Sequence, residues 1–373
     1  MLTGGRGGGL RRLGESGQVG SGGRGWRGFA DLALVAAAAS VVGLVLDLLG
    51  LPSAALFGGL LVGLVRGLTG RRTLAVPGPL AIAGQAVLGV SIGALVDLDT
   101  LAALGADWLP VLLVVLGTLA LSLAAGLLLR LRPGITPVTG AFSMIAGGAS
   151  GITAMARELG ADDRMVAVLQ YLRVLLIVVL MPLVASTVYG ADPGGGASPA
   201  GGRGPGWVVG VLLTAGCAGV GIGLGRLLHV PVPSLLGPLA VAAGLDLSGL
   251  LGDVSVPPLL AAASFVVIGL TVGLNFDRAS LRTIGGALPL ALAVIVGVIL
   301  ASAGLGALLA ATTGASALDA YLATTPGGLY AVLATASGTG ADATFVLAVQ
   351  VLRLFVMLGA APLLARWLRA GRA

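Results

Sequence analysis

The chain has almost none of the residue types on which most enzyme active sites depend. Its 373 residues include one histidine, one cysteine and no lysine, so all 21 basic residues are arginine. One histidine and one cysteine cannot supply the ligands of a copper or non-haem iron centre. Without lysine there is no Walker-type phosphate site, and there is no HExxH motif or histidine-based triad. We therefore expect a protein that is not an enzyme and needs no cofactor.

Charge is also scarce. Charged residues make up 10% of the chain and hydrophobic residues 57%, a composition that excludes an ordinary soluble domain. Apolar runs recur along the chain, each near the roughly 20 residues that cross a bilayer. The arginines lie mainly between these runs, where they act as an orientation signal. No helix-turn-helix pattern with a basic recognition face is present, so we expect lipid and not nucleic acid as the surroundings.

A long internal repeat is present, and its two copies are related by one constant offset along the chain. Four features of the first copy recur in the second at this offset: Gly147-Gly148 with Gly327-Gly328, Asp162 with Asp342, Gln170 with Gln350, and Arg173 with Arg353. The register continues without a gap from Gly89 to Pro182. Internal duplication within a membrane is the usual architecture of secondary transporters.

Hydropathy divides each copy into six apolar segments. They lie at 29–49, 53–68, 79–96, 108–130, 136–156 and 164–186, and at 207–228, 233–249, 257–275, 285–310, 315–336 and 343–365. The sequence predicts an all-α integral membrane protein with four parts: a disordered cytoplasmic stretch (1–25), membrane repeat 1 (26–189), a Gly/Pro-rich linker (190–206) and membrane repeat 2 (207–373).

The fifth segment of each copy is interrupted, at Gly147–Gly151 and at Thr324–Gly328. Lipid does not tolerate unpaired backbone groups, so each break must be buried in protein or line a wet cavity. If both segments turn back, nearly all loop arginines lie on the side of a cytoplasmic N-terminus. If both cross, Arg226, Arg278 and Arg282 lie outside, against the positive-inside rule. The charges thus predict about ten spans plus two re-entrant or broken segments, with the two copies inverted.

Arg173 and Arg353 are the most informative polar residues. Each follows an aspartate that can begin the sixth helix, Asp162 or Asp342, at the same spacing in both copies. At about 1.5 Å per residue this spacing places the guanidinium close to the bilayer midplane, where an arginine is costly unless it is paired or faces water. Two such arginines at one depth predict a cationic site for an anion. The alternative is a structural arginine bonded to carbonyls of the broken segment.

The breaks themselves can expose free amides to an anion. Close helix packing through small residues is the other interpretation of such glycine-rich stretches. The candidate substrate-binding residues are Arg173, Arg353, Gln170, Gln350, Gly147, Gly148, Ser150, Gly151, Thr325, Pro326, Gly327 and Gly328.

Three acidic residues are candidates for coupling or gating: Asp162, Asp342 and Asp319. The other interpretation of Asp162 and Asp342 is a favourable charge at a helix N-terminus. Asp97, at the end of the third segment, is expected to be an exposed helix cap. Na⁺ or H⁺ as a coupling ion stays open.

The glycine-rich break at Gly147–Gly151, together with Gln170 and Arg173 and their second copies, resembles the duplicated AbrB-type bacterial membrane proteins. The resemblance covers nearly the whole chain after about residue 30. Members carry inherited labels such as "ammonia monooxygenase" or "regulator of gene expression". The family is distantly similar to inverted-repeat cation/proton antiporters and anion transporters, which implies transport and names no substrate.

We therefore expect a multi-pass protein of the bacterial inner membrane, with cytoplasmic termini, that moves a small anionic solute by alternating access. One repeat's scaffold would move against the pair of broken segments. The alternative is a non-transporting membrane regulator of gene expression that senses a ligand in the same cavity. A homo-oligomer is compatible with either function.

Overall fold

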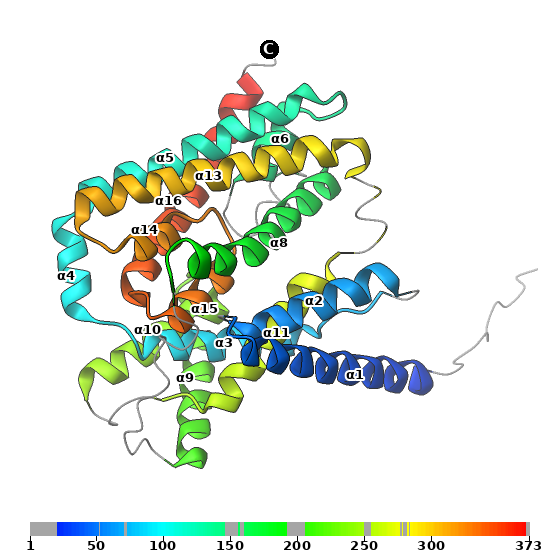
Figure 1. Ribbon diagram of the computed structural model, residues 1–373, viewed down its shortest axis with the longest axis vertical. Helices are drawn as coiled ribbons and strands as arrows, with labels where there is room; N and C mark the ends of the chain where they lie inside the picture. The colour runs from blue at the N-terminus through cyan, green and yellow to red at the C-terminus, as the bar shows by residue number, and fades with distance from the viewer. Residues whose placement is uncertain are drawn as a thin grey trace, which may run out of the picture.

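The computed structural model describes residues 21–51, 53–70, 73–145, 156, 160–191, 206–249, 255–276, 278, 282 and 284–370. Within these ranges the chain forms fourteen α-helices and two short 3-10 helices, with no strand. This confirms the all-α prediction for the described part of the chain. The helices pack as two bundles, the lower and upper parts of Figure 1.

The first bundle contains three helices from each half of the chain. They are α1 (Ser21–Leu48), α2 (Ala54–Thr69), α3 (Gly78–Gly93), α9 (Trp207–Leu227), α10 (Pro233–Ser248) and α11 (Pro258–Leu274). Helices of one half pair with helices of the other half: α2 lies along α11, and α3 lies along α10.

The second bundle holds the remaining long helices and the interrupted ones. It contains α5 (Trp108–Leu128), η1 (Leu129–Leu131), α6 (Pro137–Met144), α8 (Asp163–Thr187), η2 (Gly285–Ala287), α13 (Leu288–Thr313), α14 (Ala317–Thr324), α15 (Leu329–Thr339) and α16 (Ala343–Ala370). A short helix that the sequence did not predict, α4 (Leu98–Ala106), bends 82° away from α3 and leads from one bundle to the other. Contacts between the bundles are sparse: α15 touches α3, and α8 touches α11. The connecting helix α4 packs against α16 of the second bundle.

Among the described residues, six helices are long and apolar enough to cross a membrane: α1, α5, α8, α9, α13 and α16. A seventh span is reached if the bent α3–α4 pair counts as one. The other predicted spans correspond to α2, α3 and α10, of 16 residues each, and α11, of 17 residues. All four short helices belong to the first bundle.

The glycines of the first bundle explain how its helices cross so closely. A methyl group added at Gly89 of α3 would collide with the Leu235 carbonyl of α10, and one at Gly269 of α11 would collide with the Leu56 carbonyl of α2. Only a hydrogen atom fits at these positions, so the backbones pack directly on each other.

Helices in the two halves begin at the same offset that relates the repeated motifs. The starts of α3, α5, α6 and α8, at positions 78, 108, 137 and 163, correspond at this offset to those of α11, α13, α14 and α16, at positions 258, 288, 317 and 343. Proline in the first turn and capping hydroxyls or carboxylates mark these starts, as at Thr136 and Pro137 of α6. Residues 1–20 and 192–205, which hold most of the predicted disordered stretch and linker, lie outside the described residues. α1 begins at Ser21, inside the 1–25 stretch.

Candidate functional site

The second broken segment is fully described. α14 ends at Thr324, α15 begins at Leu329, and the residues between them leave the helical path. Gly327 and Gly328 have φ of +119° and +73°, a region that side chains rarely enter, and Pro326 has no N–H to continue the helix. The break predicted from the sequence at this position is therefore present, and it leaves the last carbonyls of α14 without helical partners.

Two side chains of α16 bind those carbonyls. The Gln350 amide Nε2 donates to the carbonyls of Leu322, Ala323 and Thr325, at 2.9, 3.1 and 3.2 Å. Arg353 donates from Nη1 to the Thr325 carbonyl and from Nη2 to the Gln350 Oε1. A cation at the C-terminal end of a helix is also favoured by the helix dipole.

The first half repeats this arrangement where α6 ends. Gln170 Nε2 donates to the Phe142 carbonyl at 2.9 Å, and Arg173 Nη1 donates to the Met144 carbonyl. Both arginines therefore cap the end of a short helix, α6 or α14, which is the structural role that the sequence left open beside anion binding. Four candidates of the first break, Gly147, Gly148, Ser150 and Gly151, lie outside the described residues.

Capping does not use the whole of either guanidinium. Arg173 and Arg353 are only 3% and 4% exposed, and the Nε of each has no hydrogen-bond partner. The ion pair found among the described residues is elsewhere, between Arg66 and Asp31. The second bundle thus holds two buried positive charges that the described carboxylates do not neutralise.

Arg173 also touches the break of the other half. A Cβ built on Gly327 would lie 3.2 Å from Nε and 3.4 Å from Nη2 of Arg173. The Nε–Nη2 edge of the guanidinium therefore faces the side of Gly327 on which a side chain would stand. Gly327 N–H donates to the Thr325 carbonyl at 3.0 Å, and that carbonyl also accepts from Arg353, so both arginines meet at one break.

The candidate coupling residues lie at helix starts. Asp162 and Asp342 cap α8 and α16, where their carboxylates accept backbone N–H groups of the first turn. The backbone N–H of Asp342 donates to the Asp319 carboxylate at 2.7 Å, and that of Asp162 donates to the Thr139 hydroxyl at 3.2 Å. Asp319, at 9% exposed, is part of this framework. Thr139 was missed, although its alignment with Asp319 was a usable signal.

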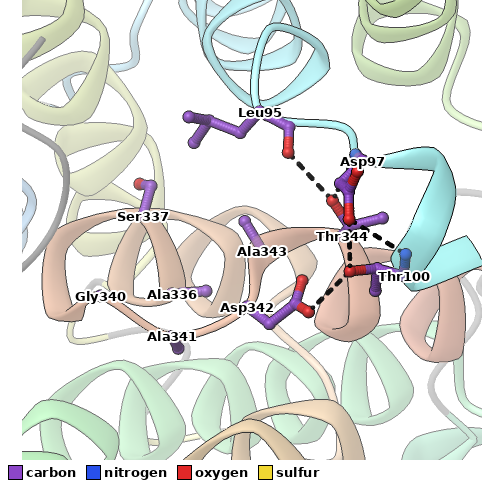
Figure 2. Close-up of a pocket in the computed structure, with 10 residues that line it drawn as sticks. All are labelled: Leu95, Asp97, Thr100, Ala336, Ser337, Gly340, Ala341, Asp342, Ala343 and Thr344. Carbon is purple, nitrogen blue, oxygen red and sulfur yellow. Dashed lines mark hydrogen bonds between the residues drawn. The ribbon is translucent and has the colours of Figure 1, made fainter.

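Asp342 also lines a pocket of about 420 Å³ where the α3–α4 bend meets the junction of α15 and α16. Figure 2 shows the Thr100 hydroxyl between two carboxylates, 3.0 Å from Asp97 and 3.1 Å from Asp342. Thr344 joins the same turn, because its hydroxyl donates to the Leu95 carbonyl and accepts from the Asp97 N–H, both at 3.0 Å. Hydrogen bonds from the backbone and hydroxyl of Thr100 lower the pKa of Asp97. Sequence reasoning missed Thr100 and Thr344, which carry no distinguishing pattern.

A second, smaller cavity of about 20 Å³ lies between the bundles. One wall comes from α2 and α11 of the first bundle and the other from α8 and the start of α15. The lining residues are Leu56, Val174, Val178, Ile268, Gly269, Val272, Gly328, Tyr330 and Ala331. No group of three or more histidine, cysteine or acidic residues that could hold a metal ion occurs among the described residues.

Comparison with known proteins places the chain among named relatives. Residues 9–95 and 56–369 match the family described as "Transition state regulatory protein AbrB". A protein of Escherichia coli (strain K12) named "Putative regulator AbrB" is 35% identical over 318 residues, which cover 85% of this chain and 90% of that protein. "Uncharacterized protein YhjN" of Bacillus subtilis (strain 168) is 26% identical over 294 residues, 75% of this chain and 76% of that protein.

Proposed function

The chain belongs to the AbrB family, and from that premise we propose that it is a secondary transporter of a small anionic solute, with no enzymatic activity and no resident cofactor. The observation that carries the proposal is the pair of buried arginines at the α14–α15 break. A charge taken out of water is costly unless it is paired, and neither arginine has a carboxylate partner among the described residues. An anionic solute supplies the missing charge.

The two-bundle packing supports alternating access. Few contacts join the two bundles. The second bundle can therefore move against the first bundle without breaking the close helix crossings that glycines allow within the first bundle. This division differs from the one expected from the sequence, in which the scaffold of one repeat moves. Here the scaffold is made of three helices from each half.

An inverted repeat accounts for the exchanged helix pairing. The colours in Figure 1 show α5 and α13, which begin at equivalent positions of the two copies and lie side by side, running in opposite directions. Antiparallel copies that exchange their second and third helices are related by an axis in the membrane plane, as in many transporters. In this arrangement the protein lies in the bacterial inner membrane, the termini are cytoplasmic, and the arginine-rich loops face the cytoplasm.

Coupling to an ion gradient would involve the acidic groups where the bundles meet. Asp342 bonds to Thr100 of α4 and receives support from Asp319 through its backbone N–H. A proton or Na⁺ bound there would change the carboxylate contact between α4 and α16, and so would alter the contact between the bundles.

Uptake by proteoliposomes tests the proposal. Purified protein is reconstituted and exposed to labelled carboxylates and inorganic anions under an imposed H⁺ or Na⁺ gradient. We expect saturable uptake of at least one anion, lost in Arg173→Gln and kept in Arg130→Gln, which changes an exposed arginine. Uptake that is unchanged in Arg173→Gln would refute the proposal. It would also be refuted if the protein neither binds nor transports any of these anions.

The second candidate is a membrane regulator that senses an anion without transporting it. The name of the Escherichia coli relative favours it. Both functions use the same arginine site, so binding does not separate them. Binding of an anion without flux in the same liposomes would support the sensor.

A further inference from the structure

We propose that the solute is a small monocarboxylate with an apolar body, whose carboxylate binds the Nε–Nη2 edge of Arg173 beside Gly327. This inference rests on the proposed function and names its substrate class. Three observations lead to it: an open guanidinium edge, a glycine that keeps the edge open, and an apolar cavity next to both.

The open edge has the geometry that carboxylates use. Arg173 Nη1 is engaged by the Met144 carbonyl, whereas Nε, although buried, has no partner. Nε and Nη2 present two parallel N–H groups, the fork that binds a carboxylate in a bidentate manner. Arg353 offers less, because both of its Nη atoms are used by Thr325 and Gln350. One open edge is suited to one carboxylate.

Gly327 determines whether the edge is accessible. A side chain at this position would bring its Cβ to 3.2 Å from Nε and 3.4 Å from Nη2, where it would crowd a carboxylate bound to these two atoms. Glycine at 327 tolerates the φ of +119°, and it places no side chain against the buried guanidinium.

The apolar cavity lies next to this edge along two segments of the chain. Val174 follows Arg173, Gly328 follows Gly327, and both line the cavity between the bundles. No charged residue is among its lining residues, so a second carboxylate would be buried without a partner. The aliphatic or aromatic part of a solute would instead contact Leu56, Val178 and Ile268.

The cavity as it stands is too small to hold the body of a solute. About 20 Å³ holds roughly one water molecule. Its walls belong to different bundles, so the movement that opens access also widens the cavity. The solute would therefore be held between the moving parts, with its charge on the second bundle and its body against both.

Binding to the purified full-length protein in nanodiscs tests the class. The probes are benzoate and butyrate, compared with succinate, sulfate, phosphate and the neutral isostere benzamide. Affinity is measured by calorimetry and by ligand-dependent thermal shift. We expect benzoate and butyrate to bind about tenfold or more tightly than the other anions, and benzamide not to bind.

Variants locate the carboxylate. Gly327→Ala should weaken benzoate binding about tenfold or more, as expected for the loss of a charge-assisted hydrogen bond. Gly314→Ala is the control for backbone strain: its φ is +69°, no atom lies within 4 Å of its added Cβ, and binding should be kept. If Gly327→Ala does not fold, Arg173→Lys is the second test. Lysine keeps the positive charge but lacks the two parallel N–H groups, so benzoate binding should weaken by a similar factor.

The outcomes separate this inference from the proposed function. Sulfate or succinate binding as tightly as benzoate, with loss in Arg173→Gln, would overturn the monocarboxylate class and leave anion transport standing. Benzoate binding unchanged in both Gly327→Ala and Arg173→Lys would overturn the placement at Arg173. No anion binding at all would overturn both proposals.

Discussion

Arg173 and Arg353 are equivalent by sequence and differ in their surroundings. Each binds a carbonyl at the C-terminal end of a short helix, but Arg353 also donates to Gln350, whereas Arg173 faces a glycine. The glutamines differ in the same sense, because Gln350 binds three carbonyls and Gln170 one. The comparison indicates that one copy of the motif mainly supports the fold, and that the other keeps a free edge for a ligand.

Replacement of the arginines gives the largest expected effect and the most direct test of this comparison. Arg353→Gln should destabilise the protein more than Arg173→Gln, since it removes two buried hydrogen bonds and not one, at about 1.5–3 kcal/mol for each hydrogen bond from a charged group. Arg173→Gln should cause the greater loss of anion binding. Thermal unfolding and ligand-induced shift of the same detergent-purified variants measure both. Equal stability losses with equal binding losses would mean that the two arginines do not differ in role.

The glutamines sharpen the comparison. Gln350→Ala removes the donor to three carbonyls and the acceptor of Arg353 Nη2, so we expect a loss of about 2–4 kcal/mol, counting about 1 kcal/mol or more for each buried bond. Gln170→Ala removes the bond to the Phe142 carbonyl and should cost about 1 kcal/mol. The unfolding midpoints in denaturant provide the measurement. A larger loss in Gln170→Ala would reverse the assignment of the supporting copy.

Asp319 and Thr139 accept hydrogen bonds from the backbone N–H groups of the capping aspartates, Asp342 and Asp162. Replacing them tests whether the two halves also differ away from the arginines. Asp319→Ala removes a charged acceptor from the Asp342 N–H and should cost about 1.5–3 kcal/mol, whereas Thr139→Ala removes a neutral one and should cost about 0.5–1.5 kcal/mol. Thermal unfolding of the two variants is compared at one pH. The exchange variant Asp319→Thr should fall between Asp319→Ala and the unchanged protein.

The smallest effect is expected at Asp97, outside the arginine site. Hydrogen bonds from Thr100 lower its pKa, so the folded protein binds a proton there less readily than the unfolded chain. This contribution is present above the ordinary pKa of aspartate and is lost as the pH falls through the lowered value. Asp97→Ala should lower the unfolding temperature slightly at pH 7, and the difference should shrink at the lowest pH that keeps the protein folded. Asp99→Ala is the control, and a difference that grows on acidification would contradict the assignment.

Much of the fold could be predicted from the pattern of residues along the chain. Apolar length and scarce charge predicted the long helices, and the Thr324–Gly328 stretch predicted the break after α14, since proline and positive-φ glycines are local properties. Bends and helix lengths were less predictable. α4 and its 82° bend have no strong periodic signal. α3, α10 and α11 end one or two residues short of their predicted lengths, whereas α2 has the predicted length.

The sequence by itself determined the repeated motifs, the break and the isolation of two arginines in apolar helices, because each is a matter of composition or spacing. Only the tertiary structure decided what the arginines touch. Capping by Gln350 and Arg353, and the approach of Gly327 to Arg173, join residues that are far apart in the chain. Such contacts depend on how α8 and α16 pack around the break. Two copies with the same motif can therefore differ in chemistry, because each guanidinium has its own neighbours.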